Sequence, residues 1–206
     1  RGGVVPPGDI RKCILAMSAD TKSAFARAFS HRFSYLDDHS LGNLILIAFA
    51  EEMGSFPDAI HICEYMLDAR GHVYPSTLGD VSLTGVTVDG QELSGEHNIG
   101  DAPCRIQTVT LHPAHVQAHP AALNQIRAAE FIVLGPGSLF TSIIPNLLVP
   151  GVLESIRKAK AREENPAKTV FVCSLADMQG ETWGMNCYDY VEALMRHGME
   201  GLLDYV

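Results

Sequence analysis

The sequence feature that most constrains this chain is a short apolar run followed by a glycine-rich turn. The run is Phe131–Leu134, and Gly135-Pro136-Gly137 follows it directly. A short, partly β-branched apolar run is typical of a strand buried in a parallel sheet. Glycine ends such a strand easily because it adopts backbone conformations that are closed to other residues. The sequence therefore predicts a buried parallel strand with a tight turn at its carboxyl end.

The residues after this turn have the character of an anion site. Ser138 can cap a short helix that we expect to reach Ile144. The free N–H groups and the dipole at a helix start favour negative charge, and glycine lets a ligand approach the backbone closely. The alternative is a turn that binds nothing, but the number of polar side chains that follow favours a site. The ligand-binding residues predicted here are Gly135, Gly137, Ser138, Thr141 and Asn146.

Composition excludes several classes of protein. The net charge of −9 does not suggest a nucleic-acid binder. The apolar run at residues 44–50 is too short to span a membrane, and no stretch approaches 18 apolar residues. The five cysteines form no Cys-x-x-Cys pair, which fits reduced cytosolic thiols better than a disulfide framework. The chain starts on Arg-Gly-Gly and ends like the beginning of a strand, so we expect both ends to belong to something longer.

The N-terminal part reads as a loop over residues 2–9 and then two helices. Asp9 is a good N-cap for a helix over residues 10–19, and Thr21 can cap a second helix that runs to about Phe33. Arg11 lies in the first turn, where the helix dipole disfavours a cation. Arg11 is therefore either solvated or faces an anion, and the second interpretation makes it a candidate ligand-binding residue beside Asp9.

A second polar turn precedes an almost wholly apolar helix. His39, Ser40 and Asn43 stand at its start, and Gly42 permits close approach. Ser40 could simply be an N-cap with structural neighbours, but the whole cluster favours a site. The preceding acids at positions 37 and 38 could hold a metal, although a solvated loop is the simpler interpretation.

The middle of the chain changes from helical to strand periodicity. A helix begins at Phe56 with Gly71 as its C-cap, and we expect its His61 to face solvent or a neighbouring residue. Strands are predicted at residues 81–86, 93–99 and 104–111, with a hairpin turn at residues 89–90. We interpret residues 72–112 as an antiparallel β insertion. The histidines that follow, His112, His115 and His119, invite a metal interpretation, but prolines interrupt them and no carboxylate or cysteine supports them locally.

The C-terminal half alternates strands and helices. Helices are predicted at residues 120–129, 151–162 and 188–197, and a strand at residues 169–173. This alternation favours one α/β domain over residues 1–206, with a mostly parallel sheet and helices on both faces. Ligands of such sheets bind beyond the carboxyl ends of the strands. The loops at residues 135–138 and 174–182 could therefore converge on one crevice with residues 39–43.

Three common enzyme signatures are missing from the sequence. It has no Gly-x-Ser-x-Gly elbow, no lysine that would complete a Walker motif, and no Gly-x-Gly-x-x-Gly fingerprint. The residues alone therefore indicate an anion- or nucleotide-binding α/β protein and assign it no cofactor.

Seven stretches, read together, resemble a known family. They are Pro6-Pro-Gly-Asp-Ile-Arg11, His39-Ser-Leu-Gly-Asn-Leu44, Tyr74-Pro-Ser-Thr77, Asp89-Gly90 with Gly95-Glu96, Leu134-Gly-Pro-Gly-Ser-Leu-Phe-Thr-Ser142, Pro145-Asn-Leu-Leu-Val-Pro-Gly151 and Gln179-Gly-Glu-Thr182. These stretches look like the gluconeogenesis factor (YvcK-type) branch of the CofD-like family. They occur in the family's order and span nearly the whole chain.

The resemblance implies a fold and a function. It implies a Rossmann-like three-layer sandwich and a cytoplasmic bacterial protein that forms a homodimer. Members of this branch are associated with carbon metabolism, cell wall and cell shape, and are thought to bind nucleotide sugars such as UDP-N-acetylglucosamine. The enzyme branch, 2-phospho-L-lactate transferase, builds a deazaflavin coenzyme from a guanosine-diphosphate-linked precursor and would require Mg²⁺. Residue by residue, the resemblance carries ligand binding to Asp9, Arg11, His39, Ser40, Gly42, Asn43, Gly135, Gly137, Ser138 and Thr141.

The chain also departs from the family pattern. The glycine-rich strand turn and the Asp-Asp segment at the family's N-terminus have no counterpart here, so no catalytic acid is assigned. Asp38 stands where the family usually has Gly, the loop at residues 174–182 is altered, and Asp189-Tyr190 replaces Asp-His. A nucleotide-sugar-binding regulator is the first hypothesis. A phospholactate-type transferase and a scaffold with a vestigial crevice remain as alternatives.

Overall fold

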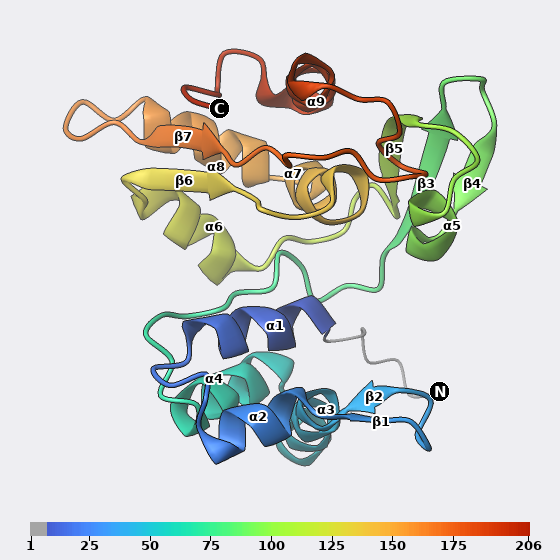
Figure 1. The fold of residues 1–206 in the computed structure, drawn as a ribbon. Helices are drawn as coiled ribbons and strands as arrows, with labels where there is room; N and C mark the ends of the chain where they lie inside the picture. Colours follow the sequence, from blue (N-terminus) through green and yellow to red (C-terminus); the bar gives the residue numbers. More distant parts are fainter. Residues whose placement is uncertain (1–7) are drawn as a thin grey trace. The chain divides into compact units, whose positions relative to one another are not determined.

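The structure is a computed structural model that describes residues 8–206. Its backbone divides into two compact units, one that ends at Asp80 and one that comprises Val81–Val206. The fold is mixed α/β, with helices and small sheets in both units (Figure 1). The loop expected at residues 2–9 lies almost entirely outside the described residues.

The first unit is mainly helical. Its elements are α1 (Gly8–Met17), α2 (Ala24–Ser30), β1 (Arg32–Phe33), β2 (His39–Ser40), α3 (Leu41–Met53) and α4 (Phe56–Met66). The two short strands pair antiparallel. The helices bury one apolar face each, and Ile14, Phe29, Leu46 and Ile60 form the centre of the core.

The helix starts of this unit differ from the sequence predictions in two places. Asp9 is not an N-cap, because it lies inside the first turn of α1 and pairs with Lys12 at 3.0 Å. Thr21 is not the cap of α2 either. Ser23 takes that position, and its hydroxyl accepts the N–H of Ala26 at 3.1 Å. α2 therefore starts later than predicted and ends before Phe33, which lies in β1.

The prediction of Gly71 as a C-cap is also wrong, since α4 ends at Met66 and Leu67 is its C-cap. Gly71 serves packing instead, because a Cβ at this position would lie 2.9 Å from the sulfur of Met17.

The second unit contains two sheets. The strands β3 (Ser82–Thr87), β4 (Glu92–Ser94) and β5 (Ile106–His112) form an antiparallel sheet in the order β4-β3-β5. β6 (Phe131–Leu134) pairs parallel with β7 (Lys168–Phe171). Tyr205 adds a parallel bridge to Val170, so the chain end does begin to pair as a strand.

Helices surround these two sheets. They are α5 (Glu96–Gly100), α6 (Pro120–Ala128), the π-helical turn η1 (Leu139–Ile143), α7 (Ile144–Leu148), α8 (Val152–Lys160), α9 (Cys187–Leu194) and a second π-helical turn, η2 (Met195–Met199). The helices predicted around residues 120–129, 151–162 and 188–197 are thereby confirmed. The core of the unit includes Ile99, Phe140, Phe171 and Leu194.

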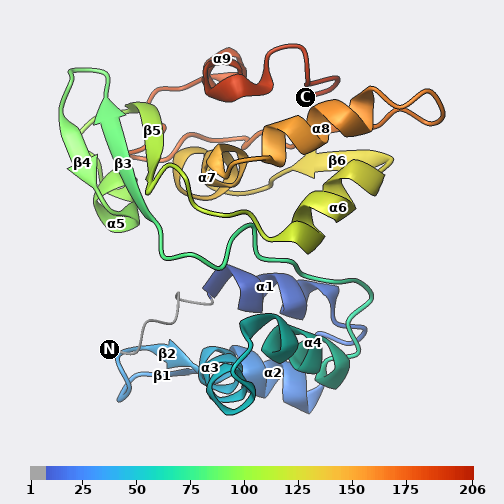
Figure 2. The same ribbon diagram turned by 180° about the vertical axis from the view of Figure 1, so that it is seen from behind.

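The strand predicted at residues 131–134 forms, but it is not buried on both faces. Phe131 is 68% exposed and Val133 is 56% exposed. Alternate residues of a strand point to opposite faces, and α6 and α8 lie on the same face of the β6–β7 pair (Figures 1 and 2). The side chains of Ile132 and Leu134 pack into the core. No described helix covers the side chains of Phe131 and Val133.

The strand expected at residues 93–99 is only partly correct. β4 ends at Ser94, Gly95 adopts a φ of +89°, and α5 begins at Glu96. A positive φ is unfavourable for residues other than glycine and breaks the extended backbone. Leu93 and Ile99 are therefore part of two different elements, although their spacing also fits one strand.

No single described helix is both long and apolar enough to cross a bilayer. The one pair of described helical segments that would qualify together, Leu139–Leu148 and Val152–Lys160, is bent by 75°. That pair contributes Ile144 and Ile156 to the core.

Candidate functional site

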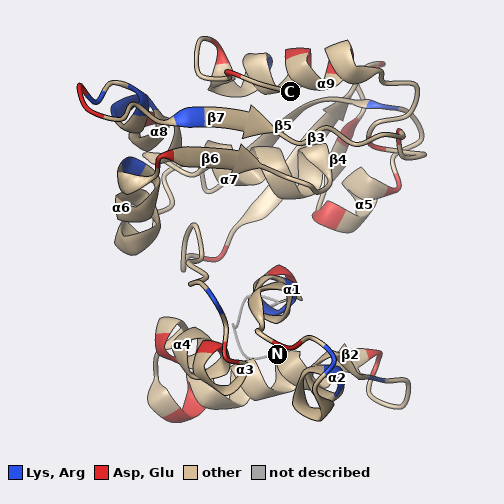
Figure 3. Ribbon diagram, turned by 60° about the vertical axis from the view of Figure 1, so that its left-hand side comes forward, with Lys and Arg blue, Asp and Glu red and all other residues tan. Residues whose placement is uncertain are grey.

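A cavity of about 430 Å³ lies in the second unit. Three segments line it: α5 with the residue after it, the start of η1, and the loop that follows β7. The lining residues are Glu96, His97, Gly100, Asp101, Ser138, Thr141, Met178 and Glu181. We call this the acidic cavity, because three carboxylates contribute to its wall. Figure 3 shows acidic residues on α5, whereas basic residues gather on α8 and at the start of β7.

Glu181 is the buried carboxylate of the acidic cavity, with 1% of its surface exposed. Its Oε1 accepts the backbone N–H of Phe140 at 3.2 Å, and its Oε2 accepts the hydroxyl of Thr141 at 3.0 Å. Burial raises the pKa of Glu181, and the negative charge of Glu96 adds to this, while the hydrogen bonds from Phe140 and Thr141 act in the opposite direction. The N–H and hydroxyl that the sequence offers to an external anion thus bind a carboxylate of the chain itself.

Gly180 positions this carboxylate. It has a φ of +99°, and a Cβ there would lie 2.3 Å from the carbonyl oxygen of Gly100. The backbone of the loop can therefore approach the end of α5 only with glycine at this position. The carbonyl of Glu181 accepts the N–H of Ile106 at 2.9 Å, which fixes the loop to β5.

The turn after β6 has the local geometry that glycine permits. Gly135 has a φ of +87°, and a Cβ there would lie 3.1 Å from the carbonyl oxygen of Val172. The hydroxyl of Ser138 does not cap η1. The carbonyl of Ser138 instead accepts the N–H groups of Ser142 and Ile143 at 3.0 and 2.9 Å. The predicted side-chain cap is thus wrong, because the first turn is π-helical and uses the backbone.

The residues predicted in this segment have different positions. Ser138 and Thr141 line the acidic cavity. Gly135 and Gly137 form the turn that leads to it. Asn146 is exposed one helical turn further on, where its amide donates to the carbonyl of Ser142 at 2.6 Å.

The residues predicted at 39–43 belong to the first unit. The hydroxyl of Ser40 is buried and accepts the N–H of Asn43 at 3.3 Å, so Ser40 is an N-cap of α3. Gly42 permits the close approach of the ring of Phe29, because a Cβ at this position would lie 2.7 Å from that ring. His39 is exposed in β2. The buried Oδ1 of Asn43 has no hydrogen-bond partner among the described residues.

Arg11 is buried in α1, with 5% of its surface exposed, so the solvated interpretation is wrong. Its Nε has no hydrogen-bond partner within residues 8–206. Burial lowers the pKa of Arg11, and the positive charge of Arg32 lowers it further. Arg32 also donates to Asp38, at 2.8 Å to its carbonyl and 3.2 Å to its carboxylate, which places Asp38 in a structural turn. The expected convergence of residues 39–43 with the loops at residues 135–138 and 174–182 stays a prediction.

Sequence reasoning did not single out the carboxylates of the acidic cavity. Glu96 and Glu181 are in stretches that carry the family resemblance, which was the available signal for both. Asp101 had no such signal. The strand expected at residues 93–99 also concealed that Glu96 and Asp101 lie at the two ends of one short helix.

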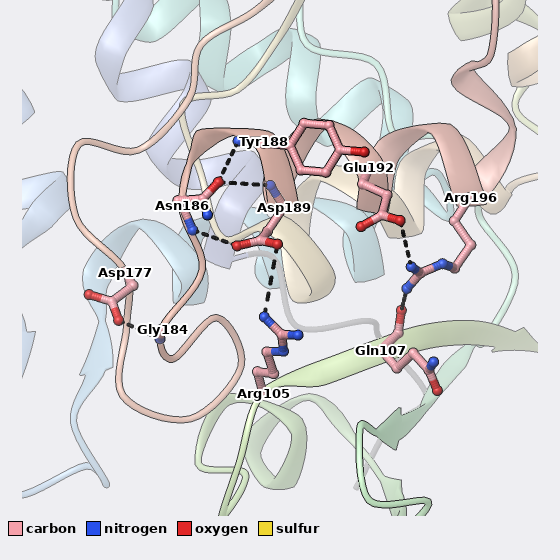
Figure 4. Close-up of polar contacts among 9 residues, drawn as sticks. All are labelled: Arg105, Gln107, Asp177, Gly184, Asn186, Tyr188, Asp189, Glu192 and Arg196. Atoms are coloured by element: carbon pink, nitrogen blue, oxygen red, sulfur yellow. Dashed lines mark hydrogen bonds and ion pairs between the residues drawn. The ribbon is translucent and has the colours of Figure 1, made fainter.

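A smaller hollow of about 80 Å³ lies between β5 and α9, and its polar groups bind one another (Figure 4). Arg196 donates to the carbonyl of Gln107 at 3.0 Å, and Arg105 pairs with Asp189 at 3.9 Å. Asp189 also completes the capping box of α9 with Asn186. These contacts fasten η2 to β5 and α9 to the residue before β5, and they give Asp189 a structural role.

Comparison with known proteins places this architecture in a family. The sequence profile described as 2-phospho-L-lactate transferase CofD matches residues 1–206. The gluconeogenesis factor of Bacillus subtilis is 39% identical over 206 residues, which cover 98% of this chain and 63% of the relative. The gluconeogenesis factor of Halalkalibacterium halodurans is 37% identical over 204 residues, which cover 98% of this chain and 61% of the relative. The chain belongs to the gluconeogenesis factor branch of the CofD family.

A solved structure supports the fold of this CofD family member. The crystal structure of protein BH3568 from Bacillus halodurans matches with a TM-score of 0.88 and 36% sequence identity, covering 98% of this chain and 63% of that one. The chain thus spans less than two thirds of the length of these relatives.

Proposed function

We propose that this chain is the nucleotide-sugar-binding part of a gluconeogenesis factor, a cytoplasmic regulator of carbon metabolism, cell wall and cell shape. The ligand that we propose is UDP-N-acetylglucosamine or a close analogue. The relatives are named gluconeogenesis factors, which supports the role in carbon metabolism. The proposal of this ligand rests on the acidic cavity at the carboxyl end of β6.

The chemistry of the acidic cavity favours the sugar part of such a ligand. Carboxylates accept hydrogen bonds from hydroxyl groups, which a pyranose or ribose ring presents in numbers. Glu96 and Asp101 stand on one wall and the hydroxyl of Ser138 on another. A bare phosphate would be repelled by the same carboxylates. We therefore propose that the phosphates lie toward the Gly135–Gly137 turn. The volume of about 430 Å³ is within the range of small-molecule sites.

We also propose that β6, β7 and the strand that begins at Tyr205 are part of a mostly parallel sheet in a Rossmann-like three-layer sandwich. Two parallel pairings support this, that of β6 with β7 and that of Val170 with Tyr205. A homodimer is the assembly expected for this branch, and it is part of the proposal.

The alternative is a phospholactate-type transferase, which the description of the family profile favours. Such an enzyme would bind Mg²⁺ through one or two carboxylates together with the phosphates of its substrate. Among the described residues, the ligand atoms of Glu96, Asp101 and Glu181 do not come together as a three-ligand group, so the cavity offers no preformed site made of these carboxylates alone.

Thermal unfolding separates these hypotheses. The chain is unfolded with UDP-N-acetylglucosamine, with GDP plus Mg²⁺, and without ligand. A ligand at one hundred times its dissociation constant stabilises a protein by about 2.7 kcal/mol, which is a readable shift. We expect UDP-N-acetylglucosamine to raise the unfolding temperature. The Ser138→Ala substitution should reduce this shift, and Asn146→Ala should leave it unchanged. A shift only with GDP and Mg²⁺ would favour the transferase, and no shift with either would favour a scaffold.

A further inference from the structure

Three side chains of metal-binding type, which have no part in the proposed function, gather in the first unit. They are His61, Glu64 and His72, and their ligand atoms all lie within 4.8 Å of one another. The Nδ1 atoms of His61 and His72 lie 3.1 and 3.0 Å from the same atom, Oε2 of Glu64. Among the described residues, this is the group of histidine, cysteine and acidic side chains whose ligand atoms lie close enough to share one metal ion.

The local fold builds this group from two segments. His61 and Glu64 are three residues apart on α4 and therefore share one face of the helix. The chain then turns back along α4. The N–H of Ala69 holds this turn, because it donates to the carbonyl of Glu64 at 2.9 Å. The N–H of Val73 donates to Oε1 of Glu64 at 2.5 Å. These two bonds place His72 beside the carboxylate.

The return segment is also held from its other side. Arg70 donates its N–H to the carbonyl of Met17 at 2.8 Å, and Ala69 forms a bridge with Ser18. The three ligands are thus arranged by backbone contacts with α1 and α4. A site whose ligands are held in place loses little conformational freedom when it binds an ion.

The spacing fits one divalent ion. Bonds of roughly 2.0–2.2 Å from zinc to nitrogen and oxygen place neighbouring ligand atoms roughly 2.9–3.4 Å apart at the angles found in tetrahedral and octahedral sites. The two distances to Oε2 of Glu64 are within this range. Hydrogen bonds alone would give similar distances, so the chemistry of the three side chains must also suit an ion.

The carboxylate is buried and the imidazoles are open. The side chain of Glu64 is 6% exposed, while those of His61 and His72 are 49% and 65% exposed. A buried carboxylate between two imidazoles is a donor set that suits a borderline cation.

We propose that His61, Glu64 and His72 bind a divalent transition-metal ion, Zn²⁺ in the first place, with the remaining coordination position open to solvent. The ion would fasten the segment after α4 to the helix. The neighbouring Cys63 is not a ligand, because its side chain is wholly buried in the core of the first unit.

The test is zinc titration of the metal-free full chain by calorimetry. We expect one equivalent to bind. His61→Ala and His72→Ala should each weaken binding at least about tenfold, since even the loss of outer-shell partners weakens metal sites 10–100-fold. Glu64→Gln should do the same, and it keeps an acceptor for the N–H of Val73. The matched control is His115→Ala, which removes an exposed histidine in the other unit.

A second measurement keeps the result independent of folding. Circular dichroism shows whether each variant retains the helix content of the parent chain, and His72→Ala removes a side chain from a loop. Cobalt in place of zinc reports the ligands, because thiolate ligands add a strong charge-transfer band in the near ultraviolet. Absence of binding to the parent chain would overturn the proposal. Unchanged affinity in folded His61→Ala and His72→Ala, or a thiolate band, would overturn it as well.

Discussion

The hydroxyl of Thr141 donates a hydrogen bond to the carboxylate of Glu181 across 3.0 Å, although the two residues are forty positions apart in the chain. With the N–H of Phe140, this contact holds a buried negative charge at the start of η1. It therefore joins the turn after β6 to the loop after β7, the two segments that form one side of the acidic cavity.

Replacing Thr141 with Val removes this donor and keeps the shape of the side chain. We expect Thr141→Val to lower the free energy of unfolding by about 1.5–3 kcal/mol at a pH above the raised pKa of Glu181, because hydrogen bonds to charged groups contribute that much. The loss should be smaller at pH 4, where the carboxyl is neutral. Urea unfolding at both pH values measures the difference. Thr110→Val, at an exposed position of β5, is the control and should change stability by less than about 0.5 kcal/mol. Equal losses at the two pH values would contradict the expectation.

The buried His197 predicts an acid dependence of stability. Its Nε2 accepts the N–H of Val109 at 3.1 Å, so its Nδ1 carries the proton and donates to the carbonyl of Ala193 at 2.7 Å. Burial lowers the pKa of His197, and the positive charge of Arg196 adds to this. The unfolded chain therefore binds a proton below about pH 6.5 that the folded chain does not, and stability falls as pH falls below that value.

The measurement for His197 is the free energy of unfolding between pH 7.5 and 5.5. His197→Gln retains an acceptor for the N–H of Val109 and does not titrate, so it should show a weaker dependence on pH in this range. NMR titration of the His197 ring gives a direct check. A ring that takes up a proton above pH 6.5 in the folded chain would refute the assignment.

Local patterns predicted much of the fold. Phe131–Leu134 pairs as a parallel strand, and α6, α8 and α9 occur where periodicity and caps indicated them. Ser40 illustrates the limit of such patterns. A serine before an apolar helix is consistent both with a cap and with a ligand site, and the structure shows that its hydroxyl is used in the cap.

What could not be predicted depends on contacts between distant segments. Nothing near Glu181 in the sequence indicates that it binds Phe140 and Thr141. The same holds for His72, which reaches Glu64 only because the chain turns back along α4. The exposure of Phe131 also depends on which faces the helices cover, and an apolar run alone does not reveal this.

Gly180 allows a test of how the loop after β7 is placed. Gly180→Ala would put a Cβ 2.3 Å from the carbonyl oxygen of Gly100, and its φ of +99° is unfavourable for alanine. Gly184 also has a positive φ, of +74°, but a Cβ there would meet nothing within 4 Å. We expect Gly184→Ala to lower stability by about 1 kcal/mol, and Gly180→Ala by at least about 2 kcal/mol, because it adds a clash to the backbone strain. Urea unfolding compares the two, and equal losses would show that the contact with Gly100 is unimportant.

Substitution of Asn43 can distinguish a role of this residue in ligand binding from a role in stability. Its buried Oδ1 has no partner in the described structure, and an unsatisfied buried acceptor is unfavourable by about 1–3 kcal/mol. Asn43→Ala should therefore leave the stability of the ligand-free chain unchanged or increase it, since alanine also favours a helix. If a nucleotide sugar donates to this oxygen, the same change should weaken binding of UDP-N-acetylglucosamine at least about fivefold, corresponding to about 1 kcal/mol. Calorimetric titration and urea unfolding of the same variant measure both effects. Unchanged affinity would move the ligand away from Asn43, and a large loss of stability would show that Oδ1 has a structural partner.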